Sequence, residues 1–588
     1  MNMESQIDPR SMDVGDLLLA NGAISEELLV AVRAQQQESG ASTAQCLVST
    51  GNVSEEIVIR SLAELEHVEF HPLDTYQPEE KLIRSIPAKL IFHYEMLPLS
   101  VDDGGISIAF GDLPDPLELG NLRLLLGKRI NVVLAPPARI RAHIRECFGL
   151  GAETVDQIEE DQLTPEMDVE RIYEVASDSK GRLREGAISK LVDQILNEAL
   201  ESRATDIHIE PYRDTIRLRY RIDGILQRVP LPADLKQLYG AIVSRLKVMA
   251  DLDISERRLP HDGRISMRNR GEPFDLRVSV IPTKHGETVC LRILGRESLF
   301  LKWDQLGMNA HQEALFSKLV SLPQGLILVT GPTGSGKTTS LYAALAQAND
   351  EGRKIVTIED PVEYEMDGIS QIQTRDDIGL TFAGGLRSVL RHDPDVVLVG
   401  EIRDHDTAQI AVRAAQTGHL VLSTLHANDS VGVIPRLIGM DMDPYLIAAS
   451  LKASVAQRLT RRLCESCKVP ENNLDASLVA EMTRRLHMEA SAIRAWKGVG
   501  CDACQGRGFR GRVAVYEFLT MNDDLAEAIT RGASLSEIKR AALQDGWQTL
   551  RDHALEKIQM GTIGLEELSR VTWRLEPTSS HSNSGSLP

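Results

Sequence analysis

Apolar positions follow two spacings along this chain, and the changes between them divide it into segments. Between residues 12 and 66 they lie three and four positions apart, as on one face of a short helix. Two related pieces in this stretch share an L-x-x-x-G step and a Ser-Glu-Glu sequence. Serine favours the N-cap position and glutamate the first turn, so each Ser-Glu-Glu is expected to begin a helix. The pattern predicts a helical repeat module over residues 1–66.

Strand-like and helix-like segments follow this repeat. VEFHPL, YEMLPLSV, GISIAFG and INVVLAP are typical of strands, and NLRLLLG and PARIRAHIRECFG are typical of helices. They predict a small α/β domain over residues 67–150. Cys46 and Cys147 lie in apolar helical surroundings, so we expect packed thiols rather than metal ligands. Residues 153–170 hold eight acidic residues and no basic one, which predicts a solvated linker over residues 151–185.

Residues 186–297 are expected to form a second α/β domain. TDIHIEP and TIRLRYRI alternate as half-buried strands do, and FDLRVSVIP and ETVCLRIL add two more strands. Asp223 and Gly224, between RYRI and ILQRV, are typical of a two-residue hairpin turn. Apolar residues at helical spacing mark one helix face: Leu235, Leu238, Ile242, Leu246 and Met249.

Residues 306–460 contain continuous apolar runs, LILVT, KIVTIED, DVVLVGE and HLVLSTL, separated by helical sequence. Such runs predict a mostly parallel sheet with helices on both faces. Ligands bind at the carboxyl ends of the strands in sheets of this kind. Polar residues that follow the runs are therefore candidates for chemistry: Glu359, Asp360, Glu363, Glu401 and His426.

The run LILV precedes the pattern G-x-x-x-x-G-K-[ST] and the helical sequence TTSLYAALAQA. Strand, glycine-rich loop and helix in this order predict a phosphate-binding loop, because backbone N–H groups and the helix N-terminus converge on phosphate oxygens. Lys337 is expected to reach the β- and γ-phosphates of a nucleoside triphosphate, and the Thr338 hydroxyl to hold Mg²⁺. The predicted loop residues are Gly331, Pro332, Thr333, Gly334, Ser335, Gly336, Lys337, Thr338 and Thr339.

Two C-x₂-C pairs follow the predicted sheet, at Cys464 and Cys467 and at Cys501 and Cys504. Two-residue spacing lets two thiolates hold one tetrahedral Zn²⁺, and four cysteines fill such a site. We therefore predict a structural zinc module over 461–515, with free or redox thiols as the alternative. Helices are expected over 516–575, as a C-terminal helical part of the nucleotide domain, and a disordered tail over 576–588.

Composition narrows the class of protein. The net charge of −20 and the pI of about 5.3 argue against a general polyanion binder. Aromatic residues make up 4%, so base-stacking platforms look sparse and no nucleic-acid partner is expected. No apolar run approaches the length of a membrane span, and the first residues lack the regions of a signal peptide. We expect a cytoplasmic protein.

Four motifs stand in an order that resembles the secretion ATPases of type II secretion and type IV pilus assembly. GPTGSGKTT at 331–339 resembles their Walker A motif, TIEDPVEYE at 357–365 their Asp box, LVGEIRD at 398–404 their Walker B segment and GHLVLSTLHAND at 418–429 their His box. The resemblance covers residues 186–575. It implies a RecA-like P-loop ATPase core preceded by a PAS-like domain, with ATP as the nucleotide.

The same resemblance implies a homo-hexameric motor for pilus or pseudopilus assembly. Its partners would be inner-membrane platform and cytoplasmic-domain proteins, through which it would associate peripherally with the inner membrane. A nucleic-acid translocase on a related core is one alternative. A scaffold that binds ATP without turnover is another, although carboxylates at strand ends argue against it.

Four residues are assigned roles in ATP hydrolysis. Glu363 is expected to orient the attacking water and Glu401 to lie in the outer shell of Mg²⁺, because in-line hydrolysis needs both functions. The alternative for either is a capping or ion-paired carboxylate. His426 and His419 bracket one predicted strand, and both are expected to sense the γ-phosphate.

Two arginines of the second α/β domain match ones that the family uses to contact nucleotide phosphates. They are Arg264 in HDGRI and Arg277 in DLRVS. An arginine brought to the phosphates would neutralise charge as an arginine finger does. The alternative is that they pair with Asp262 and Asp275 and hold strands together.

The N-terminal repeat resembles a family module that can bind cyclic di-GMP. Asp13 stands where that motif favours arginine, and Ala44 where its second copy favours glycine. An arginine would both stack on guanine and pair with phosphate. Docking to an inner-membrane partner is therefore the favoured interpretation, with cyclic di-GMP binding as the alternative.

Overall fold

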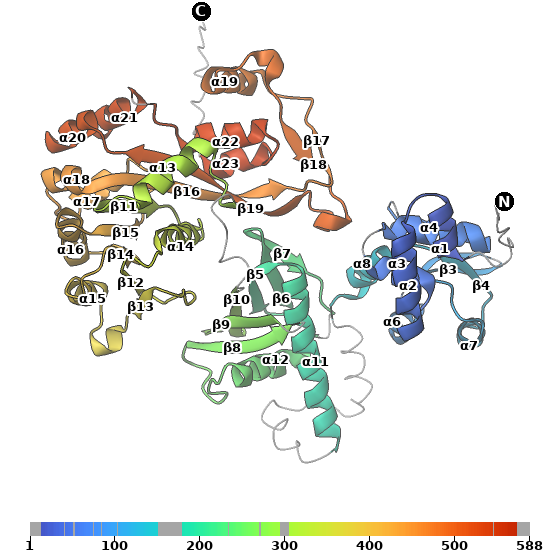
Figure 1. The fold of residues 1–588 in the computed structure, drawn as a ribbon. Coiled ribbons are helices and arrows are strands. Elements are labelled where there is room, and N and C mark those ends of the chain that lie inside the picture. Colours follow the sequence, from blue (N-terminus) through green and yellow to red (C-terminus); the bar gives the residue numbers. More distant parts are fainter. Residues whose placement is uncertain are drawn as a thin grey trace, which may run out of the picture. The chain divides into compact units, whose positions relative to one another are not determined.

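The computed structural model describes residues 13–150 and 179–572, apart from residues 40, 51–52, 75, 84, 103, 233–234, 270–271, 295–304 and 545. The chain divides into two compact units, Met1–Leu294 and Gly295–Pro588 (Figure 1). Most of the predicted linker at 151–185 and all of the predicted tail at 576–588 lie outside the described residues. None of the described helices combines the length and apolarity that a transmembrane span needs.

The first unit begins with the predicted helical repeat. Each copy contributes two helices: α1 (Val14–Ala20), α2 (Glu26–Ser39), α3 (Thr43–Thr50) and α4 (Glu55–Glu66). Ser25 caps as predicted, because its Oγ accepts from the Leu28 N–H at 3.3 Å. Ser54 precedes α4 in an extended conformation but makes no side-chain cap bond to the described residues. The capping prediction is therefore correct for the first copy only.

A four-stranded sheet follows in the order β1-β4-β3-β2. Its strands are β1 (Glu69–Phe70), β2 (Leu97–Asp102), β3 (Gly105–Phe110) and β4 (Ile130–Leu134), and its helices are α5 (Glu80–Ile83), α6 (Ala88–His93), α7 (Pro116–Leu126) and α8 (Pro137–Phe148). The four strands and two of the helices were predicted, whereas α5 and α6 were not. Buried residues from Val14 to Ile144 form one continuous core, so the repeat and this sheet pack as a single body.

The second part of this unit is a six-stranded antiparallel sheet in the order β7-β6-β5-β10-β9-β8. Its strands are β5 (Ala204–Pro211), β6 (Ile216–Ile222), β7 (Ile225–Val229), β8 (His261–Asn269), β9 (Glu272–Thr283) and β10 (Gly286–Leu294). Asp223 and Gly224 have φ of 49° and 84°, as a two-residue hairpin turn requires. Apolar residues of one sheet face pack against α11 (Ser179–Glu201) and α12 (Leu235–Met249).

The second unit is built on a seven-stranded sheet in the order β13-β12-β14-β15-β11-β16-β19, parallel except for β19 (Figure 1). The strands are β11 (Gly325–Thr330), β12 (Ile355–Glu359), β13 (Ser370–Gln373), β14 (Val396–Val399), β15 (Leu420–Leu425), β16 (Leu451–Leu463) and β19 (Phe509–Thr520). The helices around it are α13 (Ala310–Val320), α14 (Lys337–Ala348), α15 (Phe382–Val389), α16 (His405–Gln416), α17 (Val433–Ile438) and α18 (Pro444–Ser450). This is the predicted α/β nucleotide domain.

The boundary expected at residue 460 falls inside β16. That strand continues to Leu463 and pairs with β19, which begins at Phe509 within the predicted zinc module. The module is therefore an insertion between two paired strands of the main sheet, and it contains β17 (Lys468–Pro470), α19 (Ala476–Leu486) and β18 (Trp496–Gly498). The predicted helices follow β19, as α20 (Asp523–Thr530), α21 (Leu535–Gln544), α22 (Leu550–Gln559) and α23 (Glu566–Val571).

Candidate nucleotide and metal sites

The predicted phosphate loop joins β11 to α14. All six residues of β11 are buried, so the loop starts from a fixed strand end. Gly331, Gly334 and Gly336 have φ of 152°, 77° and 87°, conformations that L side chains rarely adopt. The Ser335 Oγ is buried and has no hydrogen-bond partner among the described residues. This loop thus has the backbone freedom and an open polar group that a phosphate site needs.

Lys337 begins α14 and folds back over this loop. Its Nζ donates to the carbonyls of Gly331 at 2.9 Å and Pro332 at 3.2 Å. Burial lowers the pKa of Lys337, the charge of Glu401 opposes that shift, and the charge of Arg458 adds to it. A half-buried ammonium whose hydrogen-bond partners among the described residues are carbonyls gains an anionic partner when phosphate enters. Thr338, next in the helix, is exposed, so its hydroxyl is accessible to Mg²⁺.

Glu401 and His426 lie together at the ends of neighbouring strands. β14 pairs with β15, and Glu401 and His426 follow these two strands closely. The His426 Nε2 lies 3.5 Å from a Glu401 carboxylate oxygen. Arg403 forms an ion pair with the same carboxylate, and that hydrogen bond raises the pKa of Arg403. The structure thus places Glu401 close enough to interact electrostatically with both Lys337 and His426. This agrees with the expectation that polar residues at strand ends lie together.

Tyr342 connects the phosphate-loop helix to the segment that carries Glu363. The Glu363 N–H donates to the Tyr342 Oη at 3.3 Å. Tyr342 in turn donates to Glu359, which is buried and also accepts from the Thr357 hydroxyl at 2.5 Å. Burial and the bond to Glu359 raise the pKa of Tyr342. Glu359 is therefore occupied by internal hydrogen bonds, whereas Glu363 is half-buried in the following loop.

His419 does not lie with this group within one chain. It precedes β15, and its carbonyl accepts from Gly325 at the start of β11. Its ring contacts the Ala414 carbonyl at 3.1 Å. A six-residue strand separates it from His426, about 20 Å at the usual rise. Within one chain His419 and the phosphate loop therefore lie at opposite ends of the sheet, and its role as a γ-phosphate sensor stays a prediction.

Three arginines stand in a row on the antiparallel sheet of the first unit. Arg264 of β8 is directly opposite Arg277 of β9, which is directly opposite Arg292 of β10. Directly opposite residues share a sheet face, and like charges there are unfavourable without an anion. Arg292 donates to Asp206 at 2.9 Å. Among the described residues Arg264 makes no ion pair, so its predicted alternative partner, Asp262, does not hold it.

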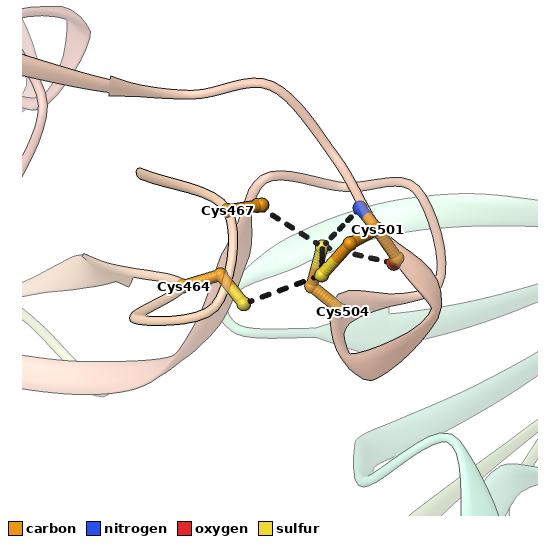
Figure 2. Close-up of side chains that lie close together, drawn as sticks. All are labelled: Cys464, Cys467, Cys501 and Cys504. Carbon is orange, nitrogen blue, oxygen red and sulfur yellow. Dashed lines mark hydrogen bonds between the residues drawn. The ribbon is translucent and has the colours of Figure 1, made fainter. Parts of the chain in front are cut away.

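The four cysteines of the insertion converge as predicted (Figure 2). One ligand atom from each lies within 4.8 Å of the others, and three cysteines are buried. The Sγ atoms of Cys464 and Cys501 are 3.8 Å apart, and those of Cys467 and Cys504 are 3.9 Å apart. Backbone N–H groups of Cys501 and Gly508 donate to the Cys504 Sγ at 3.2 and 3.1 Å, which stabilises a thiolate. Four sulfurs at these separations fit a tetrahedral Zn²⁺.

Comparison with known proteins identifies the family. The family described as "Type II/IV secretion system protein" matches residues 182–570. The type IV pilus assembly ATPase PilB of Myxococcus xanthus is 40% identical over 94% of this chain and 98% of its own length. The chain belongs to the type II/IV secretion system protein family. A type II secretion system protein E of Xanthomonas campestris is 36% identical over 95% of the chain and 98% of that protein.

A third relative of this type II/IV secretion system protein is the type II secretion system ATPase E of Vibrio cholerae, 45% identical over 66% of this chain and 75% of that protein. The predicted resemblance is thus confirmed, and the chain is a secretion ATPase with a RecA-like core. A second family, the MshEN domain, matches residues 67–154. It covers the small sheet that shares its core with the helical repeat.

Asp13, at the start of the repeat, has a structural role in this secretion ATPase. Its carboxylate accepts from the Asp16 N–H at 2.8 Å and caps α1. Arg33 pairs with Asp16 at 2.7 Å and lies 3.8 Å from Asp13. Asp13 therefore places a carboxylate where the cyclic di-GMP motif favours arginine. The nearby Arg33 is already paired with Asp16.

Sequence reasoning missed two arginines that the fold of this secretion ATPase places at candidate sites. Arg292 is the third arginine of the row. The alternation along β10 predicts which sheet face it occupies, but only the β9–β10 register shows that it lies opposite Arg277. Arg458 lies beside the phosphate loop, where a Cβ on Gly331 would be 3.1 Å from its guanidinium. No local signal marks Arg458, because its strand is distant in sequence from the loop.

Proposed function

We propose that this chain is a cytoplasmic motor that couples ATP hydrolysis to the assembly of pilus or pseudopilus subunits. The observation that carries the proposal is the convergence of Lys337, Glu401 and His426 at the carboxyl ends of adjacent strands. Relatives named for pilus assembly and for type II secretion both align with nearly the whole chain, so either system is consistent with it.

Each residue then has a task in hydrolysis. Lys337 would leave the loop carbonyls and bind the β- and γ-phosphates, and Thr338 would hold Mg²⁺, which supplies charge neutralisation. Glu401 would orient water around that metal. Glu363 would polarise the attacking water, and His426 would report the γ-phosphate.

The arginine row would complete the site from the other unit. Arg277, with Arg264 and Arg292 beside it, is proposed to bind phosphate oxygens when the two units close over ATP. The electrostatic argument is that Arg264 and Arg277 are adjacent like charges on one sheet face, which favour an anion between them. Arg292, the third arginine of the row, pairs with Asp206. Closure on ATP and opening on product release would be the power stroke.

The assembly and partners remain part of the proposal. We expect a homo-hexamer, docked by its N-terminal repeat to inner-membrane platform and cytoplasmic-domain proteins, with peripheral membrane association through them. Zn²⁺ on Cys464, Cys467, Cys501 and Cys504 would be structural. Cyclic di-GMP is the less favoured ligand of the repeat, because Asp13 and Asp16 would repel its phosphates.

The test is Mg²⁺-dependent phosphate release by the full chain, with Lys337→Ala as the inactive variant. The variant should show no turnover, because the phosphates lose their principal cation. Introduced into the native host, it should abolish surface pili or the secretion of exoproteins, and which of the two is lost assigns the system. Wild-type turnover by the variant, or a rate that depends on single-stranded DNA in a salt titration, would contradict the proposal.

A further inference from the structure

Arg458 reaches across the phosphate-loop strand. It lies on β16, which runs parallel to β11 with Ala456 opposite Thr330, so Arg458 extends past the end of β11. Its Nη2 donates to the Asn428 carbonyl at 2.6 Å, in the loop that follows His426. Since β11 separates β15 from β16 in the sheet, the guanidinium passes from one neighbouring strand to the loop of the other.

This crossing occurs directly over the first residue of the phosphate loop. The Arg458 Nη1 donates to the Gln457 carbonyl at 3.1 Å. A Cβ on Gly331 would lie 2.5 Å from that carbonyl and 2.6 Å from the Ser335 Oγ, closer than real side chains approach, and 3.1 Å from the Arg458 Nη1, which is a tight contact. The guanidinium therefore lies directly beside the first residue of the phosphate loop.

Among the described residues, the carboxylates whose charges act on Arg458 have other partners. Glu517 accepts from Ser430 and Leu550, and Asp429 pairs with Lys539 at 2.8 Å. Within the described part of the chain, Arg458 forms no ion pair. Burial lowers its pKa while the charges of Glu517 and Asp429 oppose the shift, and a guanidinium stays charged under these conditions. Its hydrogen-bond partners among the described residues are carbonyl oxygens, so it links the two loops by hydrogen bonds rather than by an ion pair.

The Thr330 hydroxyl makes a second link to the same loop, through the residues on either side of His426. The Thr330 hydroxyl donates to the Leu425 carbonyl at 2.7 Å and accepts from the Ala427 N–H at 2.7 Å. These are the residues directly before and after His426. Thr330 and Arg458 together fix the backbone of the His426 loop to the strand and loop that bind phosphate.

We propose that Arg458 is a positioning residue for ATP hydrolysis, which ties the His426 loop to the phosphate loop so that both respond to the triphosphate together. The inference rests on the proposed ATPase function. Arg458 acts through His426, which it places relative to Lys337 and Glu401. Without this link, ATP would still bind, but the His426 loop would no longer follow the loop that holds it.

The experiment compares Arg458→Lys with Arg462→Ala in the full chain, measuring kcat and KM for ATP. Lysine keeps the charge but cannot donate to two carbonyls in a fixed fork. Arg462, on the same strand, is exposed and pairs with Glu465 at 3.6 Å, so its variant should behave as wild type. For Arg458→Lys we expect kcat to fall on the order of 10- to 100-fold, the cost of misplacing a catalytic group, with KM changed by less than about threefold.

The second measurement is the non-additivity of the Arg458 and His426 substitutions. A residue with only a structural role would not show it. The double variant Arg458→Lys, His426→Ala should turn over within about twofold of His426→Ala alone, because the arginine has nothing left to position. Effects that multiply, or a normal kcat in Arg458→Lys, would overturn the inference while leaving the ATPase function intact. If the lysine variant does not fold, Arg458→Met replaces it, and failure of both assigns Arg458 a structural role. A wild-type chain without turnover would overturn the proposed function and this inference together.

Discussion

The protonation state of a titratable residue in this protein depends on its surroundings as well as on its residue type, and His553 is the clearest case. It lies on α22 with 1% of its surface exposed, and its Nδ1 accepts from the Tyr516 N–H at 3.0 Å. Gln312 contacts the same nitrogen at 3.2 Å. Burial and the charge of Lys557 lower the pKa of His553 to about 3. The folded protein therefore keeps this imidazole neutral.

That residue predicts a pH dependence of stability. Between the ordinary pKa of 6.5 and the folded value of about 3, the unfolded chain binds the proton and the folded chain does not. Stability should thus fall as the pH falls through this window, by up to about 1.4 kcal/mol per pH unit from this group. Denaturant titrations of the full chain at pH 7, 6 and 5 measure it.

The matched control is His553→Asn, whose amide oxygen can accept the same bond but does not titrate. Its stability should depend less steeply on pH than that of the wild type. Equal slopes for the two chains would show that other groups account for the acid sensitivity.

At the scale of elements, the tetracysteine insertion is joined to the core in two ways. First, the paired strands β16 and β19 lead into and out of the insertion. Second, α19 packs against α22, where Arg551 donates to both Glu481 oxygens at 2.6 and 2.7 Å. Met482, Ile493 and Ala495 of the insertion share a core with α22 and α23. Metal loss should therefore loosen the insertion without dismantling the main sheet.

Cys501→Ser tests this division. The variant should lose Zn²⁺, because a neutral hydroxyl replaces one of four thiolates. Hydrogen exchange should rise in the insertion between β16 and β19, residues 464–508, while ATP affinity stays near that of wild type. Cys147→Ser, outside the cluster, serves as the control with zinc retained. Less than about half an equivalent of zinc in the wild-type chain would refute the tetrahedral site.

Sequence reasoning succeeded for elements whose signal is local. The phosphate loop, the hairpin at Asp223 and Gly224 and the C-x₂-C pairs each occupy a short window with its own chemistry. It failed where pairing partners are distant: the return of β19 to the sheet, the Arg277–Arg292 register and the position of Arg458. His419 and His426 belong to one sequence motif but lie at opposite ends of β15, and only the carboxyl end of that strand meets the phosphate loop of the same chain.

The whole molecule has two units, and the proposed mechanism requires them to cooperate. The phosphate loop belongs to one unit and the arginine row to the other. Arg277→Ala should lower turnover at least about tenfold, because an arginine finger at the transferred phosphate is worth roughly 10³–10⁵ in kcat. Stability should change little, since Arg277 lies on the polar face of its sheet, away from the helices.

Steady-state phosphate release and thermal unfolding of the same sample measure the two effects. Arg228→Ala, on edge strand β7 of the same sheet, is the matched control and should leave the rate unchanged. An Arg277 variant that unfolds, while its folded fraction hydrolyses ATP normally, would assign the arginine to the sheet and remove it from the mechanism.

The edge position of β8 has a consequence for solubility. An edge strand presents unpaired backbone groups that can recruit a strand from another molecule, and charged side chains on it discourage such pairing. On β8, Asp262, Arg264 and Arg268 provide those charges at alternate, exposed positions. Replacing Arg264 with an apolar residue would therefore remove a proposed phosphate ligand and, at the same time, a charge that protects the edge strand against aggregation. Inactive Arg264 variants should be checked by light scattering, and Arg264→Gln keeps the edge polar while it removes the charge.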